Sequence, residues 1–126
     1  MTLDETLSLW RSTPFLYGQS DCMLSVGDYL ASRGAVDVTS LFKGRYDTED
    51  GAIVQMAAYG GACGLVDMTG VERTTEPVRG DVVVIQLGDV QIGALHTGNG
   101  VAARLERGTV EVSTRFVQIV AAWKVP

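Results

Sequence analysis

The amino-acid sequence predicts an α+β fold, in which N-terminal helices pack on one face of a C-terminal antiparallel sheet. In the first half of the chain, apolar residues recur at the spacing of an amphipathic helix. In the second half, short runs rich in β-branched residues alternate with glycine-containing turns, as in antiparallel hairpins. No internal repeat, linker or low-complexity segment divides the 126 residues, so we expect one domain spanning residues 1–126.

The first two helices are predicted from apolar spacing and from residues that stop a helix. Leu3, Leu7 and Trp10 share one face of the first helix, which Pro14 ends. A second helix is predicted over residues 21–32, and a following glycine ends it. Its expected inward-facing side chains are Cys22, Val26, Tyr29 and Leu30.

A third helix is expected to begin after a cap at Asp47 or Thr48 and to end at the glycine pair 60–61. Its predicted apolar stripe comprises Ile53, Met56 and Ala57. Residues 63–68 predict one further helical turn. The predicted strands are 82–87, 90–97, 101–107, 109–113 and 121–125, and glycine-containing turns separate the first four.

The charge and hydropathy pattern excludes several classes of function. The net charge of −5, from 10 basic and 15 acidic residues, argues against a nucleic-acid-binding groove. Arg104 and Arg107 are expected to be solvated at a strand edge. No apolar run approaches the roughly 20 residues that span a bilayer. The acidic N-terminus lacks the basic start and apolar stretch of a signal peptide, so we do not expect that export route.

The cysteines and the single histidine limit the possible metal and disulfide chemistry. Cys22 and Cys63 are too few for a disulfide framework and fit a reducing compartment as thiols. His96 is the only histidine, which excludes a His-rich metal site, and the CxxC-like spacing of zinc sites is absent. We therefore expect no metal and no cofactor, and we interpret Cys63 as a small core residue.

The segment from Tyr17 to Cys22 carries the strongest functional signal. Gly18 permits an unusual backbone angle, and Ser20 or Asp21 can cap the helix that begins at Cys22. Backbone N–H groups and the helix dipole favour a thiolate at such a position, so Cys22 is a candidate nucleophile. The alternative is a buried, inert thiol. The only imidazole that could act as its base is His96, some seventy positions further along the chain.

Several segments together resemble the NlpC-type cysteine peptidases, which are small papain-like enzymes, many of which cut peptide links in bacterial cell walls. The resemblance covers nearly the whole chain and is greatest to a short phage and prophage branch. The segments that carry it are Pro14–Gly18, Asp21–Cys22, Phe42–Tyr46, Pro77–Val83, Ile92–Gly93, Gly98–Gly100 and Trp123–Val125. The resemblance implies a papain-like fold, Cys22 as nucleophile, Tyr17 lining the site and Asp21 as a helix cap.

The sequence departs from that family where the catalytic histidine is expected. The base of active relatives matches Gln91, two residues before Gly93, and an amide cannot accept a proton at neutral pH. Side chains alternate along a strand, so His96 is expected to point away from Cys22 unless Gly93 forms a bulge. Gln91 can still donate hydrogen bonds, as an orienting group or to an oxyanion.

These observations lead to two main hypotheses and one weaker one. The first is a phage or prophage tail-tip or baseplate protein that keeps a peptidase-like fold with an incomplete catalytic set. It would be assembled in the host cytoplasm, reside in the virion tail and contact other tail proteins. The second is an active cysteine peptidase or amidase for cell-wall peptides, with Cys22 as nucleophile and His96 as base. The third is an unrelated intracellular amidase or acyltransferase.

Overall fold

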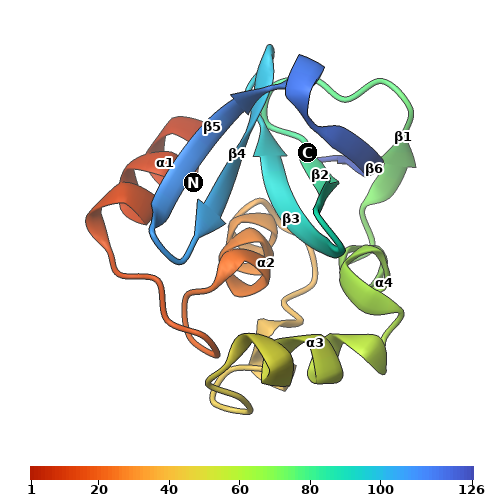
Figure 1. Cartoon of the computed structure of the whole chain (residues 1–126). Coiled ribbons are helices and arrows are strands. Elements are labelled where there is room, and N and C mark those ends of the chain that lie inside the picture. Colours follow the sequence, from red (N-terminus) through yellow and green to blue (C-terminus); the bar gives the residue numbers. More distant parts are fainter.

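The computed structural model describes all residues, 1–126, and has an α+β architecture of four α-helices and a six-stranded antiparallel sheet (Figure 1). The sheet order is β1-β6-β2-β3-β4-β5. The helices are α1 (Leu3–Ser12), α2 (Cys22–Ser32), α3 (Glu49–Ala57) and α4 (Gly61–Met68). The strands are β1 (Glu72–Thr74), β2 (Val82–Leu87), β3 (Val90–His96), β4 (Gly100–Leu105), β5 (Gly108–Ser113) and β6 (Gln118–Lys124).

Local capping explains where the first two helices begin. Thr2 and Glu5 form a reciprocal capping box at the start of α1, whose buried face includes the predicted Leu3, Leu7 and Trp10. Helix α2 begins directly after its cap, Asp21, as the sequence predicts. It lies against the sheet and supplies much of the main core, together with α1 and α4.

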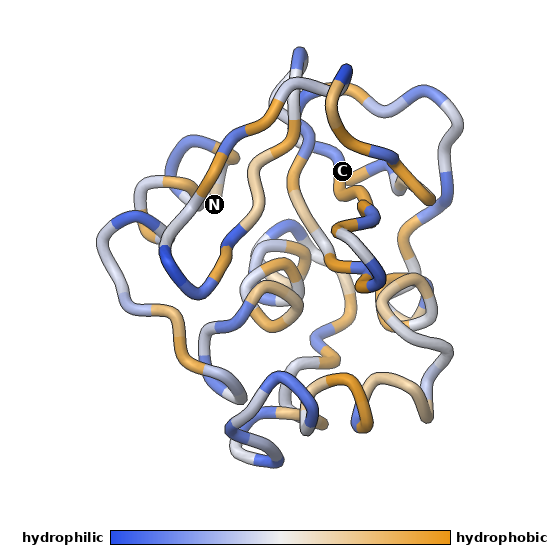
Figure 2. The backbone as a smooth tube through the Cα atoms, viewed as in Figure 1, coloured by the Kyte–Doolittle hydropathy of each residue, from blue (hydrophilic) through white to orange (hydrophobic).

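The predicted apolar stripe of α3 is wrong at two residues, Ile53 and Ala57, which are both exposed. Thr48 caps the helix as expected, but Ala52 is its buried residue, and Ile53 is 41% exposed. Ile53 and Met56 line a surface pocket beside α2, so this face of α3 borders open space rather than a packed core. Figure 2 shows the hydrophobic middle of α3 on the helix at the bottom of the molecule.

Both faces of the sheet are buried, and the helices pack mainly on one of them. Val82, Val84 and Leu95 face the helices in the main core. Val83, Ile85, Ala94 and neighbouring residues form a second apolar cluster on the opposite face, and all of its members are at most 8% exposed. Further side chains pack against this second cluster, among them Cys22 at the start of α2 and Ile119 of β6.

The strand predictions are confirmed except at β1 and at the start of β6. Strand β6 starts three residues earlier than expected, and β1 was not predicted. Strand β1 is three residues long and is held by pairing with β6, so its formation depends on a partner about fifty residues away. A local pattern of residues does not contain that information.

Candidate functional site

Asp21 organises the turn in front of Cys22. Its carboxylate accepts hydrogen bonds from the Leu24 amide at 3.0 Å, the Gly18 amide at 2.9 Å and the Tyr46 hydroxyl at 2.6 Å. Gly18 has a φ of +81°, and a side chain there would meet the backbone oxygen of Tyr46 at 1.9 Å. The turn therefore requires this glycine, and the expected role of Asp21 as a cap is confirmed.

The thiol of Cys22 is held in its protonated form. Cys22 is the first residue of α2, where helix amides stabilise a negative charge. Desolvation by burial and the neighbouring charge of Asp21 oppose this effect, and together they raise the pKa of Cys22 to about 12. Because a thiolate is the nucleophilic form of cysteine, Cys22 alone is not activated at neutral pH.

A pocket of about 240 Å³ opens beside Cys22, between α3 and the ends of β3 and β4. Four of the five predicted site residues line it: Tyr17, Asp21, Cys22 and Gln91. Most of its other walls are apolar, and they include Ile53, Met56 and Ile92. The structure thus brings together residues far apart in sequence around one thiol, in a concave and mainly apolar site.

The fifth residue, His96, lies elsewhere. Strand β3 pairs with β2 without a register shift from Val90 to Leu95, so no bulge at Gly93 changes the alternation of its side chains. Leu95 faces the helices, so His96 lies on the opposite face. It is only 6% exposed, and its Nδ1 accepts a hydrogen bond from the Gly98 amide at 3.1 Å.

Gln91 lies where the resemblance implies a catalytic base. Its side chain is hydrogen-bonded to another amide and not to a catalytic group. Its Nε2 donates to the Gln86 side-chain oxygen at 3.2 Å, across the β2–β3 hairpin. The pocket contains no imidazole. No group other than a carboxylate, a phenol or the thiol itself is therefore available there to accept a proton.

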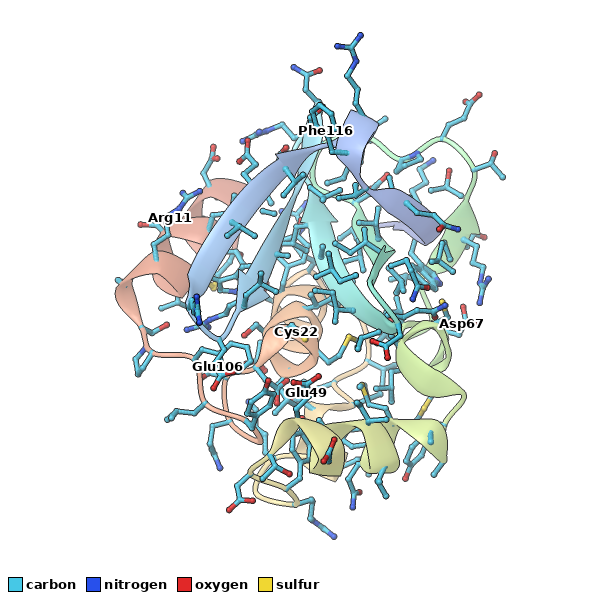
Figure 3. All side chains as sticks on the ribbon, viewed as in Figure 1. Arg11, Cys22, Glu49, Asp67, Glu106 and Phe116 are labelled. Atoms are coloured by element: carbon cyan, nitrogen blue, oxygen red, sulfur yellow. The ribbon has the colours of Figure 1, made fainter.

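The mouth of the pocket is acidic. Figure 3 shows Glu49 and Glu106 on the same side of the molecule as Cys22, one from the start of α3 and the other from the β4–β5 turn. Burial and then the charges of these two glutamates raise the pKa of Tyr17 to about 12. Neither glutamate takes part in any of the three ion pairs of the structure, so their charge is not neutralised by a basic side chain.

Arg104 is buried, contrary to the expectation that it lies at a solvated strand edge. It is 4% exposed, whereas Arg107 is exposed as expected. Its guanidinium donates to the Thr13 carbonyl at 2.7 Å, the Pro14 carbonyl at 3.0 Å and the Ser25 hydroxyl at 3.2 Å. Desolvation by burial lowers its pKa. Arg104 thus ties the loop that precedes the Cys22 turn to β4.

Sequence reasoning missed Tyr46, Glu49 and Arg104 as parts of this site. Tyr46 directly precedes the predicted cap of the third helix, but in the structure its hydroxyl donates to Asp21 and it lines the pocket. The Phe42–Tyr46 segment could have drawn attention to it, because the same segment carries part of the family resemblance. The positions of the two charged residues depend on tertiary packing and leave no local signal.

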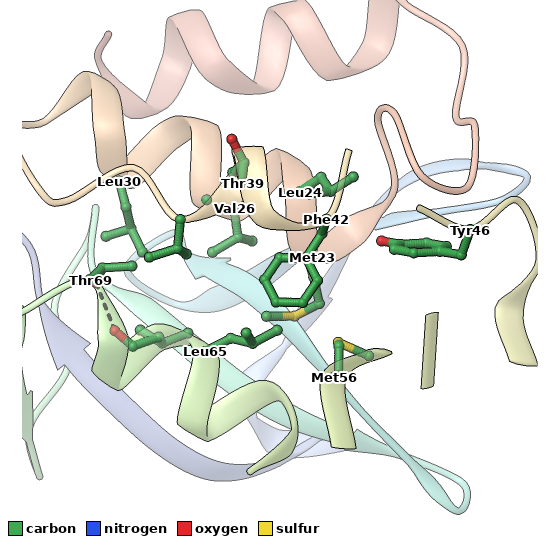
Figure 4. A pocket seen from close by; sticks show the side chains of 13 residues that line it. Met23, Leu24, Val26, Leu30, Thr39, Phe42, Tyr46, Met56, Leu65 and Thr69 are labelled. Atoms are coloured by element: carbon green, nitrogen blue, oxygen red, sulfur yellow. Dashed lines mark hydrogen bonds between the residues drawn. The ribbon is translucent and has the colours of Figure 1, made fainter. Parts of the chain in front are cut away.

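Three further features of the structure bear on binding. A second cavity, between α2, α4 and the 39–42 turn, has a volume of only about 20 Å³ and is lined mainly by core side chains (Figure 4). That is the space of about one water molecule, so it is a packing gap. No group of three or more His, Cys, Asp or Glu side chains is placed to hold a metal ion. No helix is long and apolar enough to cross a membrane.

With the fold and the pocket defined, comparison with known families gives one result. The family model described as a domain of unknown function, DUF6950, matches residues 1–125. The chain therefore belongs to this family. No curated protein and no solved structure matches the chain.

Proposed function

We propose that this protein is a non-catalytic component of a phage or prophage tail tip or baseplate, with an NlpC-like fold. The single observation that carries the non-catalytic part is the absence of an imidazole from the pocket beside Cys22. Gln91 lines the pocket where a histidine is expected, and His96 lies on the other face of the sheet. A cysteine peptidase needs a base within hydrogen-bond reach of its thiol.

The state of the thiol supports the same conclusion. Burial and the Asp21 charge raise the pKa of Cys22, whereas catalytic cysteines have a lowered pKa that a nearby cation maintains. The nearest buried cation, Arg104, is held by oxygens of Thr13, Pro14 and Ser25. The tail assignment has a different basis, namely the resemblance of Phe42–Tyr46 and Trp123–Val125 to the short phage branch.

The proposal is tested by removing the thiol and assaying both possible roles. The purified protein should release no soluble fragments from bacterial cell walls, and Cys22→Ala should behave identically. Phage particles that carry Cys22→Ala should assemble and infect normally, whereas particles without the chain should have defective tails. Cell-wall fragments released by the native protein but not by Cys22→Ala would overturn the non-catalytic role. Normal tails in the complete absence of the chain would overturn the tail role.

One observation favours an active cysteine peptidase or amidase as a second candidate. Cys22, Asp21 and Tyr17 line one open pocket, with the thiol at a helix N-terminus whose amides could hold an oxyanion. In that case a substrate amine or a group from a partner protein would have to act as the base. The cell-wall assay separates the two candidates directly.

A further inference from the structure

Strands β3 and β4 separate beside Cys22, so that the edge of β3 that faces β4 is left unpaired within the pocket. They pair at only two positions, Leu95–Ala102 and His96–Val101. Over the remaining length, β3 stays paired with β2 and β4 stays paired with β5. Figure 1 shows the two strands converging near the top of the molecule and diverging toward α3. The pocket lies where they diverge, because its walls include Val90–Ile92 and Arg104–Glu106.

Hydrogen bonds elsewhere on β3 show which backbone groups face this opening. The His96 amide donates to Asp81 and the His96 carbonyl accepts from Gly80, so the backbone of His96 points toward the β2 side. Thr97 donates instead to Gly100 at the start of β4. Because N–H and C=O groups alternate in direction along an antiparallel strand, those of Gln91 and Gly93 face the opening.

The Gly93 amide confirms that this edge lacks a strand partner. It donates to the sulfur of Met23 at 3.1 Å instead of to a carbonyl of β4. A thioether is a weak acceptor, which is an unusual partner for a buried amide. Gln91, two residues before Gly93, is exposed. Its backbone N–H and C=O groups face the opening and form no hydrogen bond with β4. Edges of this kind are usually protected by lysine, proline or a covering segment.

We propose that this opening binds an extended segment of a partner protein, which adds as a strand to the free edge of β3 and carries a basic residue. Main-chain bonds to Gln91 supply the pairing, and the apolar walls accept alternate side chains. The pocket lining holds three carboxylates, those of Asp21, Glu49 and Glu106, against one cation, Arg104. Neither glutamate forms an ion pair, so the net negative lining provides the charge complementarity that favours lysine or arginine. The inference rests on the proposed function in one respect, namely that the segment is retained and not cleaved.

The test uses a library of acetylated seven-residue peptides as the probe, followed by measurements on the enriched sequences. We expect enrichment of peptides with a lysine or arginine and without proline. N-methylation of the peptide backbone, one amide at a time, should weaken binding about tenfold at every second position. The amide NMR signals of Gln91 and Gly93 should shift on binding. No enrichment, a loss without this alternation, or shifts confined to β1 or β5 would overturn strand addition.

Charge variants test the selectivity for a basic residue. The double variant Glu49→Gln/Glu106→Gln should weaken binding of the basic peptides about three- to tenfold at low salt, and the loss should shrink as salt is added. The matched control, Glu72→Gln/Glu76→Gln, removes the same charge outside the pocket and should leave binding unchanged. Equal losses in both double variants would contradict the selectivity.

Mass spectrometry of the peptide after prolonged incubation separates this inference from the proposed function. An intact peptide with alternating N-methyl losses supports both. A peptide that is bound in this way and then cleaved would overturn the non-catalytic role and leave strand addition standing. An intact peptide that shows no binding would overturn strand addition alone.

Discussion

At the scale of single residues, the site depends on one carboxylate. Asp21 is 2% exposed and accepts bonds from the amides of Gly18 and Leu24 and from the Tyr46 hydroxyl. It therefore joins the turn, the start of α2 and the segment before α3. The same charge also raises the pKa of Cys22, so the residue that builds the turn disfavours the thiolate beside it.

Replacing this carboxylate should destabilise the fold. We expect Asp21→Ala to lower the free energy of unfolding by about 2 kcal/mol, because it removes a helix cap and leaves the Tyr46 hydroxyl without its partner. Asp21→Asn keeps one side-chain oxygen for the Leu24 amide and should cost less. Urea unfolding measures both. Equal stability of Asp21→Ala and the native protein would show that the three bonds contribute nothing net.

At the scale of elements, Arg104 connects β4 to the loop between α1 and α2. Its bonds to Thr13, Pro14 and Ser25 hold the segment that leads into the Cys22 turn. Arg104→Met keeps much of the side-chain volume but removes these bonds, and we expect a loss of about 2 kcal/mol in the free energy of unfolding.

The exposed neighbour Arg107 provides the matched control for this variant. Arg107→Met removes the same charge from the turn after β4 and should change stability by less than about 0.5 kcal/mol. Denaturant unfolding of the two variants side by side decides the matter. If both lose the same stability, the buried bonds of Arg104 are not what holds the loop.

The elements also show how far sequence reasoning reaches. Helix α2 and its cap were predictable because an acidic cap and an apolar spacing lie within a few residues of each other. Hairpin β2–β3 was predictable for the same local reason. The burial of Arg104 depends on carbonyls of a loop some ninety residues away, and the exposure of Ile53 depends on a pocket between elements. Neither arrangement is encoded locally.

Five site residues were predicted from the sequence, most of them through the resemblance to the NlpC-type peptidases. Four of these five line one pocket in the structure. The alternation of side chains along β3 also indicated that His96 would point away from Cys22 unless a bulge intervened, and the continuous β2–β3 register provides none. The diverging edges of β3 and β4 could not be foreseen. They depend on how α2 wedges Met23 against Gly93, where an added Cβ would lie 3.0 Å from the Met23 sulfur.

At the scale of the whole molecule, the half-buried thiol of Cys22 links stability to alkaline pH. The folded-state pKa of Cys22, about 12, lies above the value of about 8.5 for an unfolded cysteine. The unfolded chain therefore loses its proton first, and this contribution to stability is complete below pH 8.5 and declines as pH rises toward 12. One such group changes the slope by at most about 1.4 kcal/mol per pH unit.

We expect Cys22→Ser to flatten the decline of unfolding free energy between about pH 8 and pH 9, where the thiol but few tyrosines ionise in the unfolded chain. Cys63→Ser is the matched control. Burial raises the pKa of Cys63 as well, and the nearby charge of Arg73 opposes that rise. Urea unfolding across this pH range provides the measurement. A native-like slope in Cys22→Ser would mean that the Cys22 thiol is not held protonated by the fold.

The whole molecule is then an α+β fold in which the Cys22 thiol, the Gln91 amide and the His96 imidazole do not form a catalytic set. The measurement that tests this claim most directly is the pH dependence of Cys22 alkylation, made in Cys63→Ser and repeated in Cys63→Ser/His96→Ala. The account predicts slow alkylation with a midpoint well above the free-cysteine value of about 8.5, unchanged by loss of His96. Rapid alkylation with a midpoint below neutral pH, lost in the His96→Ala variant, would contradict it.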